Sequence, residues 1–265
     1  MKNPLFSIGS TVQELASNLK KAIGLLFKTI YWIAVGPLRR KFVSAEYIFE
    51  QMVFAGVRSV SIVFFVNFFT GIVLAMQSAC QLKELGATMY VAGLVSVSMV
   101  RELCPVLTAL VVAGRVGAAI TAQLGSMQVT EQIEALDTMA LDPVRFLVVP
   151  RFLSLLVMLP ALTIFGDLVG NIGGYIVGVF NLKLGSTLYI DMAFKFLELK
   201  DIYTGIFKSF VFGGIIAIVS CYQGLNTSGG AEGVGRATTV SVVTSFIMVI
   251  LADCILTGVF YFSKM

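Results

Sequence analysis

The sequence predicts an all-α integral membrane protein in which an N-terminal interfacial amphipathic helix precedes five transmembrane helices. Hydrophobic residues make up 57% of the 265 residues and charged residues only 13%, and the mean hydropathy is +0.92. A soluble domain is usually about 45–50% apolar and about 25% charged, so this chain has too little polar surface to coat a soluble globule. At about 20 apolar residues per crossing, four to six crossings fit and no separate soluble domain remains.

Residues 1–50 are expected to form a region that lies on the membrane. From about residue 11 to residue 49, apolar side chains recur at helical spacing, while Lys20, Lys21 and Lys28 interrupt any long apolar run. A first span broken by lysines is the alternative interpretation. The start of the chain lacks the pattern of a cleavable signal or a transit peptide.

Five apolar segments follow and make residues 51–265 the expected membrane-crossing domain. Lysine and arginine are more frequent on the side of the N-terminus, which favours a cytoplasmic N-terminus and, after five crossings, an external C-terminus. An amphipathic run at residues 188–194 predicts a short helix in an outer loop. The five segments lie at about residues 59–77, within 93–125, and at about 152–180, 205–222 and 238–262.

The third segment carries a row of glycines at four-residue spacing. Overlapping small-xxx-small units let a second helix approach backbone to backbone, so the row predicts a tight helix–helix contact, with incidental glycine richness as the alternative. Asp167 lies beside this row and is too costly to face lipid. The four glycines are Gly166, Gly170, Gly174 and Gly178.

The second segment contains the adjacent charges Arg101 and Glu102. A single helix over residues 93–125 would be about 50 Å long, against a hydrocarbon core of about 30 Å, so the depth of these charges is open. Neighbouring helical positions point about 100° apart, and Pro105 predicts a helix start or a kink just after them. The pair could mark the outer interface or reach a cavity and meet a polar headgroup, and composition does not decide between these.

The loop after the second segment predicts a short acidic helix at about residues 130–142, suited to docking on a partner. Thr130 is a candidate N-cap, and Asp142-Pro143 predicts a second cap with proline at the first helical position. Acids in a first turn are favoured by the helix dipole. A connecting helix of no special role is the alternative. The acidic side chains are Glu131, Glu134, Asp137 and Asp142, and the expected apolar side is Ile133, Leu136 and Ala140.

Enzymatic chemistry is not expected in this chain. Residues 230–237 imitate the spacing of a phosphate-binding loop, but Arg236 and Ala237 stand where lysine and serine or threonine are required, and no strand precedes them. We expect these glycines to form a flexible cytoplasmic turn. Histidine is absent, and the four cysteines have no CxxC spacing, which predicts buried free thiols rather than a metal site or disulfides.

Several separated blocks from about residue 45 to the C-terminus occur together in a recognisable order. They are VRELCPVLTAL at 100–110, AGRVGA at 113–118, TEQIEAL at 130–136, DP at 142–143, VVPR at 148–151 and the glycine-rich block at 229–239. In this order they resemble the MlaE (YrbE) permease family. The first 40 residues resemble that family only in their general character and share no such sequence block.

The resemblance implies a homodimeric permease of an ABC transporter that moves phospholipids between the inner membrane and the outer envelope. Its expected partners are a second copy of the chain, a cytoplasmic ABC ATPase that binds ATP and Mg, an MCE-domain substrate-binding protein and, in some systems, a STAS-domain protein; no nucleic acid is implied. Residues 131–142 would be the coupling helix on the ATPase, and Arg101 and Glu102 would line the lipid cavity. A bacterial inner membrane is preferred over a plastid envelope.

Two other function classes remain as alternatives. An ion-coupled secondary carrier could use Asp167, Asp253 and Lys208 as a relay, although such carriers commonly show two related halves and no repeat is visible here. The chain could also be a non-transporting membrane anchor of a complex.

Overall fold

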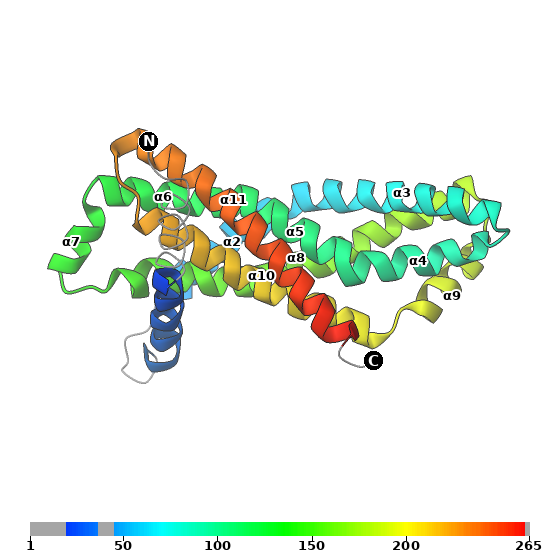
Figure 1. Ribbon diagram of the computed structural model, residues 1–265, viewed down its shortest axis with the longest axis horizontal. Coiled ribbons are helices and arrows are strands. Elements are labelled where there is room, and N and C mark those ends of the chain that lie inside the picture. The colour runs from blue at the N-terminus through cyan, green and yellow to red at the C-terminus, as the bar shows by residue number, and fades with distance from the viewer. Residues whose placement is uncertain (1–19, 37–44, 263–265) are drawn as a thin grey trace, which may run out of the picture.

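The computed structural model of the protein describes residues 20–36 and 45–262. All of the secondary structure in these ranges is helical, and the long helices run along the long axis of an elongated molecule (Figure 1). A helix at residues 20–36 comes first. The elements that follow are α2 (Ala45–Ala55), η1 (Val57–Ser59), α3 (Val60–Glu84), η2 (Thr88–Tyr90), α4 (Val91–Ser98), η3 (Met99–Leu103), α5 (Cys104–Val112), η4 (Ala113–Gly117), α6 (Ala118–Val129), α7 (Gln132–Thr138), η5 (Val144–Val148), α8 (Val149–Ile176), η6 (Val177–Asn181), α9 (Ser186–Phe196), α10 (Leu199–Leu225), α11 (Gly230–Thr257) and η7 (Gly258–Phe262).

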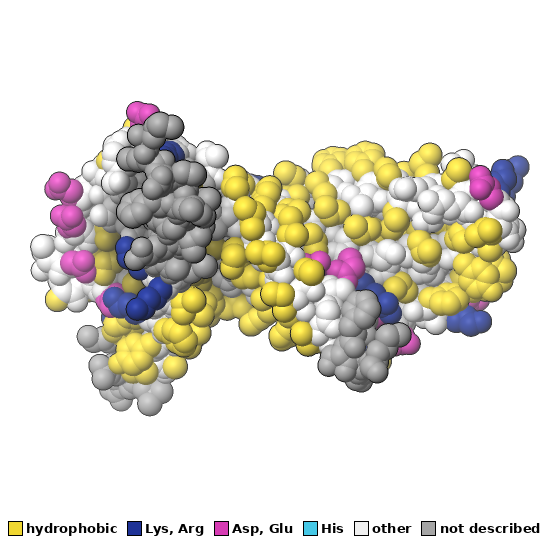
Figure 2. Space-filling view, viewed as in Figure 1, with side chains coloured by type: hydrophobic (Ala, Val, Ile, Leu, Met, Phe, Trp, Pro, Cys, Tyr) yellow, Lys and Arg dark blue, Asp and Glu magenta, His cyan; other side chains and the backbone are white. Residues whose placement is uncertain are grey.

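Five helical stretches of the described chain are long and apolar enough to cross a membrane, which confirms the predicted fold class. Each is longer than its apolar centre because the helices continue into polar sequence at their ends. Hydrophobic side chains cover the middle of the molecule (Figure 2). The stretches are Ala45–Glu84, Thr88–Val129, Val144–Asn181, Leu199–Leu225 and Gly230–Phe260.

Two boundaries differ from the sequence-based expectation. Helix α2 begins at Ala45, inside the region assigned to the interfacial helix, because it packs on α8, where the Ser154 hydroxyl donates to the carbonyl of Ile48 at 3.2 Å. The flexible turn expected at residues 230–237 is wrong, since α11 already starts at Gly230. The turn is confined to residues 226–229 and is closed by Gly229, whose φ is 93°.

The helix at residues 20–36 runs across the long axis of the bundle and is drawn in dark blue in Figure 1. A helix lying in the membrane plane would have this orientation relative to the spans. Residues 1–19 and 37–44 of the predicted interfacial region lie outside the described residues. The short helix predicted near residues 188–194 is present as α9.

The glycine row, which runs along α8 and ends in η6, faces its neighbouring helices at close range. A Cβ atom on Gly166 would lie 2.8 Å from the side chain of Asn67 in α3, and one on Gly178 would lie 2.2 Å from the ring of Tyr189 in α9. Gly170 and Gly174 lie against side chains of η3 and α4 in the same way. The row also meets a glycine of α3, because a Cβ atom on Gly71 would lie 2.0 Å from the carbonyl oxygen of Gly170. Helices α3 and α8 therefore pack backbone to backbone.

The four cysteines are free thiols, but only two have the predicted burial. Cys104 and Cys221 are buried, whereas Cys80 and Cys254 are exposed on the surface of the bundle. A thiol on an outward-facing position of a transmembrane helix is tolerated because its surroundings there are lipid and it behaves as a small hydrophobic group.

Candidate functional site

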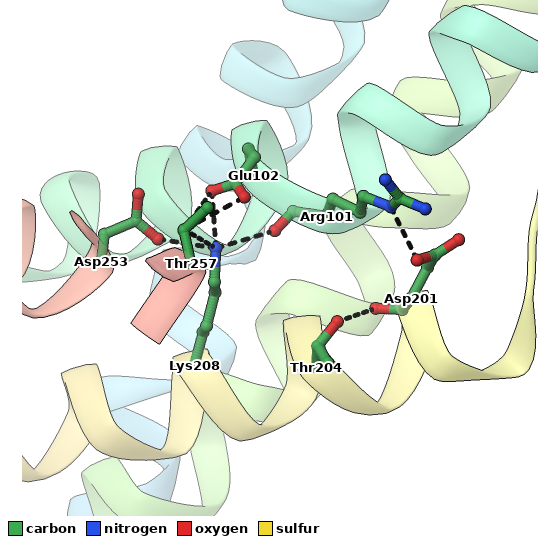
Figure 3. A network of polar contacts seen from close by, with 7 residues as sticks. All are labelled: Arg101, Glu102, Asp201, Thr204, Lys208, Asp253 and Thr257. Carbon is green, nitrogen blue, oxygen red and sulfur yellow. Dashed lines mark hydrogen bonds and ion pairs between the residues drawn. The ribbon is translucent and has the colours of Figure 1, made fainter. Parts of the chain in front are cut away.

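A cluster of charged side chains joins three helices inside the bundle (Figure 3). The Arg101 Nε atom donates to Asp201 Oδ1 at 2.6 Å. Lys208 Nζ lies 2.6 Å from Glu102 Oε2 and 2.9 Å from Asp253 Oδ1. We call Arg101, Glu102, Asp201, Lys208, Asp253 and Thr257 the charged cluster; it links η3 to α10 and α11.

The adjacent residues Arg101 and Glu102 extend from different sides of the same helix. Their side chains point in different directions, as adjacent helical residues must, and each finds a partner on α10. The partners Asp201 and Lys208 are seven positions apart, which is about two helical turns and places both on one face of α10. The Thr257 hydroxyl of α11 completes the contact with Glu102 at 3.2 Å.

Pro105 explains why the helix is irregular at this point. Proline has no N–H to donate to the carbonyl four residues earlier, which is that of Arg101. The helix adopts a π-helical turn over η3, and the Arg101 carbonyl accepts a hydrogen bond from Lys208 Nζ at 3.3 Å. The kink expected from the sequence is thus a local widening of the helix, of a kind frequent at functional sites.

The charged cluster combines buried and accessible groups. The side chains of Asp201 and Lys208 are fully buried, whereas those of Arg101 and Glu102 are each 35% exposed. Buried charges are stable only when paired, so Asp201 and Lys208 hold the two accessible charges in place. The accessible charges are the ones that could contact a ligand.

Two apolar hollows adjoin this region. One, of about 370 Å³, lies between α4 and α9 and is lined by Leu94, Val97 and Phe196, with Arg101 at its edge. The other, of about 420 Å³, lies between α4, α8, α9 and α10 and contains Asp167 among apolar side chains. Asp167 is therefore not part of the charged cluster.

Helix α7 forms the tip of the molecule at the opposite end from α9 (Figure 1). The carboxylates of Glu131, Glu134 and Asp137 are exposed there, and acidic side chains gather at this end in Figure 2. Ile133 is buried and attaches α7 to the bundle. The arrangement presents acids outward on a short helix that is anchored by one apolar face.

The ends of α7 differ from the predicted caps. Thr130 is not an N-cap; its hydroxyl donates back to the Ser126 carbonyl at 2.9 Å and closes α6. Ala140 does not lie on the apolar side, because α7 ends at Thr138 and Ala140 adopts φ 58° in the following turn. Glu131 precedes α7 with φ 60°. Left-handed backbone costs a non-glycine residue about 1–2 kcal/mol, so both ends of α7 are strained.

Asp142 ties this loop to the crosswise helix at residues 20–36. Its Oδ1 accepts the N–H of Val144 at 2.9 Å, which is the predicted cap, and its Oδ2 lies 3.0 Å from Lys28 Nζ and 3.1 Å from the Trp32 indole nitrogen. Partial burial on its own would raise the pKa of Asp142, but the hydrogen bonds from Lys28 and Val144 and the lysine charge outweigh it and lower the pKa. The guanidinium of Arg145 stacks 5.6 Å from the Trp32 ring.

Comparison with known proteins identifies the family of this chain. The family model described as "Permease MlaE" matches residues 48–259. The chain belongs to the MlaE permease family. A probable ABC transporter permease of Rickettsia typhi is 39% identical over 257 residues, which cover 97% of this chain and 99% of that one.

Other relatives come from photosynthetic organisms. A probable ABC transporter permease of Synechocystis is 42% identical over 212 residues, or 80% of this chain and 81% of that one. The chloroplastic protein Trigalactosyldiacylglycerol 1 of Arabidopsis thaliana is 34% identical over 212 residues, or 80% of this chain and 61% of that one. This permease is therefore the membrane subunit of an ABC transporter, a class that works with an ATPase partner.

Two members of the permease's charged cluster, Asp201 and Thr257, were not identified from the sequence. Asp201 was not singled out, although it occupies the third position of α10 in a capping box with Glu198, a pattern readable from the sequence. Lys208 and Asp253 were considered only as parts of an ion relay. Within the described residues, no group of three or more acids or cysteines is arranged to hold a metal ion.

Proposed function

We propose that this permease carries phospholipids, with acyl chains in the apolar hollows and the polar headgroup at Arg101 and Glu102. The observation that carries the proposal is the position of Arg101 at the edge of the hollow lined by Leu94, Val97 and Phe196. A phospholipid joins a phosphate to apolar chains in the same way, and guanidinium is well suited to phosphate because it stays charged and offers several donors. The name of the chloroplastic relative, which is that of a galactolipid, also supports a lipid cargo.

Within this proposal, Glu102 has two roles. Its partial exposure lets it shape the headgroup site, and its contacts with Lys208 and Thr257 hold α10 and α11 beside η3. A movement of α10 or α11 would therefore displace Glu102 and change the site. Binding and release of a headgroup would follow from that displacement.

The energy of ATP hydrolysis would be transmitted to the permease through α7. The exposed acids Glu131, Glu134 and Asp137 suit a groove on a cytoplasmic ATPase. ATP and Mg would bind at a separate site of that ATPase. Closure of the ATPases would push α7 and the bundle attached to it, and the strained backbone at both ends of α7 would let the helix tilt. Asp142 would pass part of this motion to the crosswise helix through Lys28 and Trp32.

The proposed assembly is a homodimer in a bacterial inner membrane, with the N-terminus cytoplasmic. Helix α11 is the span with the smallest buried share, and its outward side chains, among them Val243, Ile247 and Ile250, leave an apolar face for lipid or a second copy. An MCE-domain protein on the far side and, in some systems, a STAS-domain protein on the near side complete the proposal.

Lipid binding to purified variants tests the headgroup assignment. We expect native mass spectrometry to find bound phospholipid on the wild-type chain and on Lys83→Ala, an exposed lysine at the outer end, and much less on Arg101→Ala and Glu102→Ala. All four proteins must elute as the same species in size-exclusion chromatography. Full lipid occupancy in correctly inserted Arg101→Ala and Glu102→Ala would show that the assignment is wrong.

The geometry gives less support to an ion relay. Lys208 and Asp253 are paired, but Asp167 lies in the separate hollow beside Asn171 and Tyr175, so the three residues do not form one chain of contacts. Transport that continues without the ATPase and stops when the proton gradient is dissipated would restore that hypothesis. Normal function after the partner's ATP site is disabled would instead favour a membrane anchor.

A further inference from the structure

Arg151 is a buried cation outside the charged cluster. It lies two residues into α8, in the half of the bundle that carries α7, and is only 4% exposed. Its Nη1 donates to the Leu147 carbonyl at 3.0 Å and its Nη2 to Gln123 Oε1 at 3.4 Å. Its Nε has no partner in the described part of the chain, and no Asp or Glu oxygen of that part lies within 4.0 Å of the guanidinium.

Among the residues that the structure describes, none supplies a carboxylate counter-ion to the Arg151 guanidinium. Buried charges in proteins are normally paired, because taking an ion out of water costs several kcal/mol that neutral acceptors only partly offset. Both acceptors of Arg151 are neutral, one backbone carbonyl and one amide. An anion in the hollow beside Arg151 would supply the missing negative charge.

The surroundings of Arg151 leave room for an anion. The residue lines an open hollow of about 490 Å³ together with Ala122, Gln123, Ser126 and Met127 of α6. The amide of Gln123 and the hydroxyl of Ser126 are exposed at this wall and can each donate a hydrogen bond. Arginine, an amide and a hydroxyl are donors that commonly meet phosphate oxygens.

The depth of the site indicates which anion is present in its surroundings. The stretch Val144–Asn181 has 38 residues, or about 57 Å of helix, which exceeds a hydrocarbon core of about 30 Å by about 13 Å at each end. Arg151 is seven residues from Val144, about 10 Å along the axis. It therefore lies near the boundary between hydrocarbon and headgroups, where lipid phosphates are found.

We propose that Arg151, Gln123 and Ser126 form a phosphate-binding site separate from the charged cluster. The ligand chemistry is a phosphate group, supplied either by a phospholipid of the adjacent leaflet or by free phosphate. The site does not depend on the transported cargo, because it lies in the opposite half of the bundle from the hollow beside Arg101.

The test measures the thermal stability of the full-length chain in uncharged detergent. One arm titrates inorganic phosphate against potassium chloride of equal ionic strength. The other titrates dioctanoyl phosphatidylglycerol against dioctanoylglycerol, which has the same chains and no phosphate. The variants are Arg151→Gln, Gln123→Glu and the control Arg58→Gln, which removes an exposed arginine.

Gln123→Glu keeps the result interpretable if Arg151→Gln fails to fold. The new carboxylate would replace an amide 3.4 Å from Nη2 and act as an internal counter-ion. We expect Gln123→Glu to match or exceed the stability of the wild type without ligand. Its half-maximal phosphate or lipid concentration should rise by about tenfold or more, which corresponds to the loss of one charge-assisted hydrogen bond. Arg151→Gln should lose the response in the same way, and Arg58→Gln should keep it.

The two ligand arms identify the source of the phosphate. A response to phosphatidylglycerol alone assigns the site to a lipid, and a response that includes inorganic phosphate assigns it to free phosphate as well. If no arm stabilises the wild type, or if Gln123→Glu responds as the wild type does, the proposal is wrong. Because Arg101 is intact in every variant, loss of this response leaves the lipid occupancy of the charged cluster unchanged.

Discussion

Replacing Lys208 by methionine should destabilise the permease more than any other single change in the charged cluster. The lysine side chain is fully buried and lies 2.6 Å from a Glu102 oxygen and 2.9 Å from an Asp253 oxygen. Those two oxygens are therefore at most about 5.5 Å apart, and without the lysine they would repel by about 3 kcal/mol at an effective dielectric constant near 20.

The expected loss lies at the lower end of the range for broken buried ion pairs. Removing one partner of such a pair costs about 3–5 kcal/mol, and the Glu102 and Asp253 side chains are 35% and 21% exposed, which lets water screen part of the repulsion. We expect about 3 kcal/mol. At about 2–4 °C for each kcal/mol in a chain of this size, the apparent Tm should fall by about 6–12 °C.

The assay is a thermal melt in a fixed detergent, scored by the fraction of protein that remains monodisperse. Lys195→Met removes an exposed lysine of α9 and should leave the apparent Tm unchanged. Adding Asp253→Asn to Lys208→Met removes one of the two repelling charges and should recover about half of the loss. A Lys208→Met protein that melts within about 2 °C of the wild type, or a double variant that melts lower still, would refute the electrostatic account.

Three further outcomes follow from other parts of the structure. Ala140→Gly should raise the apparent Tm by the equivalent of about 1 kcal/mol, because residue 140 has φ 58°; an unchanged or lower Tm would contradict the turn geometry. Gly71→Ala should abolish the monodisperse peak in size-exclusion chromatography, since its Cβ would lie 2.0 Å from the Gly170 carbonyl oxygen, whereas Gly235→Ala, with open space around the Cβ, should elute normally. The lowered pKa of Asp142 means that its contact with Lys28 contributes stability above the ordinary value of 3.8 and loses it as the pH falls through the lowered value. The protection factors of the amide hydrogens in residues 20–36, which correct the exchange rates for their intrinsic dependence on pH, should therefore fall as the pH is lowered from 7 to 2, and Asp142→Asn should show lower protection at pH 7; equal protection would count against this tether.

The fold was predictable because it depends on features that one sequence carries. Long apolar stretches predict the spans, and an amphipathic run predicts α9. The boundaries of the helices were harder to predict. Residues 45–49, for example, are helical and pack on α8 through contacts that no local pattern encodes. Residues 230–237 are a second example. Their glycines predict a turn, yet the segment is part of α11.

Arg101 and Glu102 of the candidate site were predictable from the sequence, but their partners were not. Arg101 and Glu102 attract notice as adjacent charges in an apolar segment, but their partners are about 100 residues away in sequence. Only the fold brings Asp201, Lys208 and Asp253 to them. Thr130 was wrongly assigned because a threonine before acids is typical of an N-cap, yet it can equally return its hydroxyl to the preceding helix, as it does here.

The central claim is that the permease moves phospholipid by using the energy of a partner ATPase. The most direct measurement is the transfer of a fluorescent phospholipid by the purified complex of this chain and its ATPase in proteoliposomes. We expect transfer to require ATP, to stop when the ATPase site is disabled, and to fall strongly in Arg101→Ala and Glu102→Ala complexes that still hydrolyse ATP. Transfer at the wild-type rate without ATP hydrolysis, or in both variants, would contradict the account.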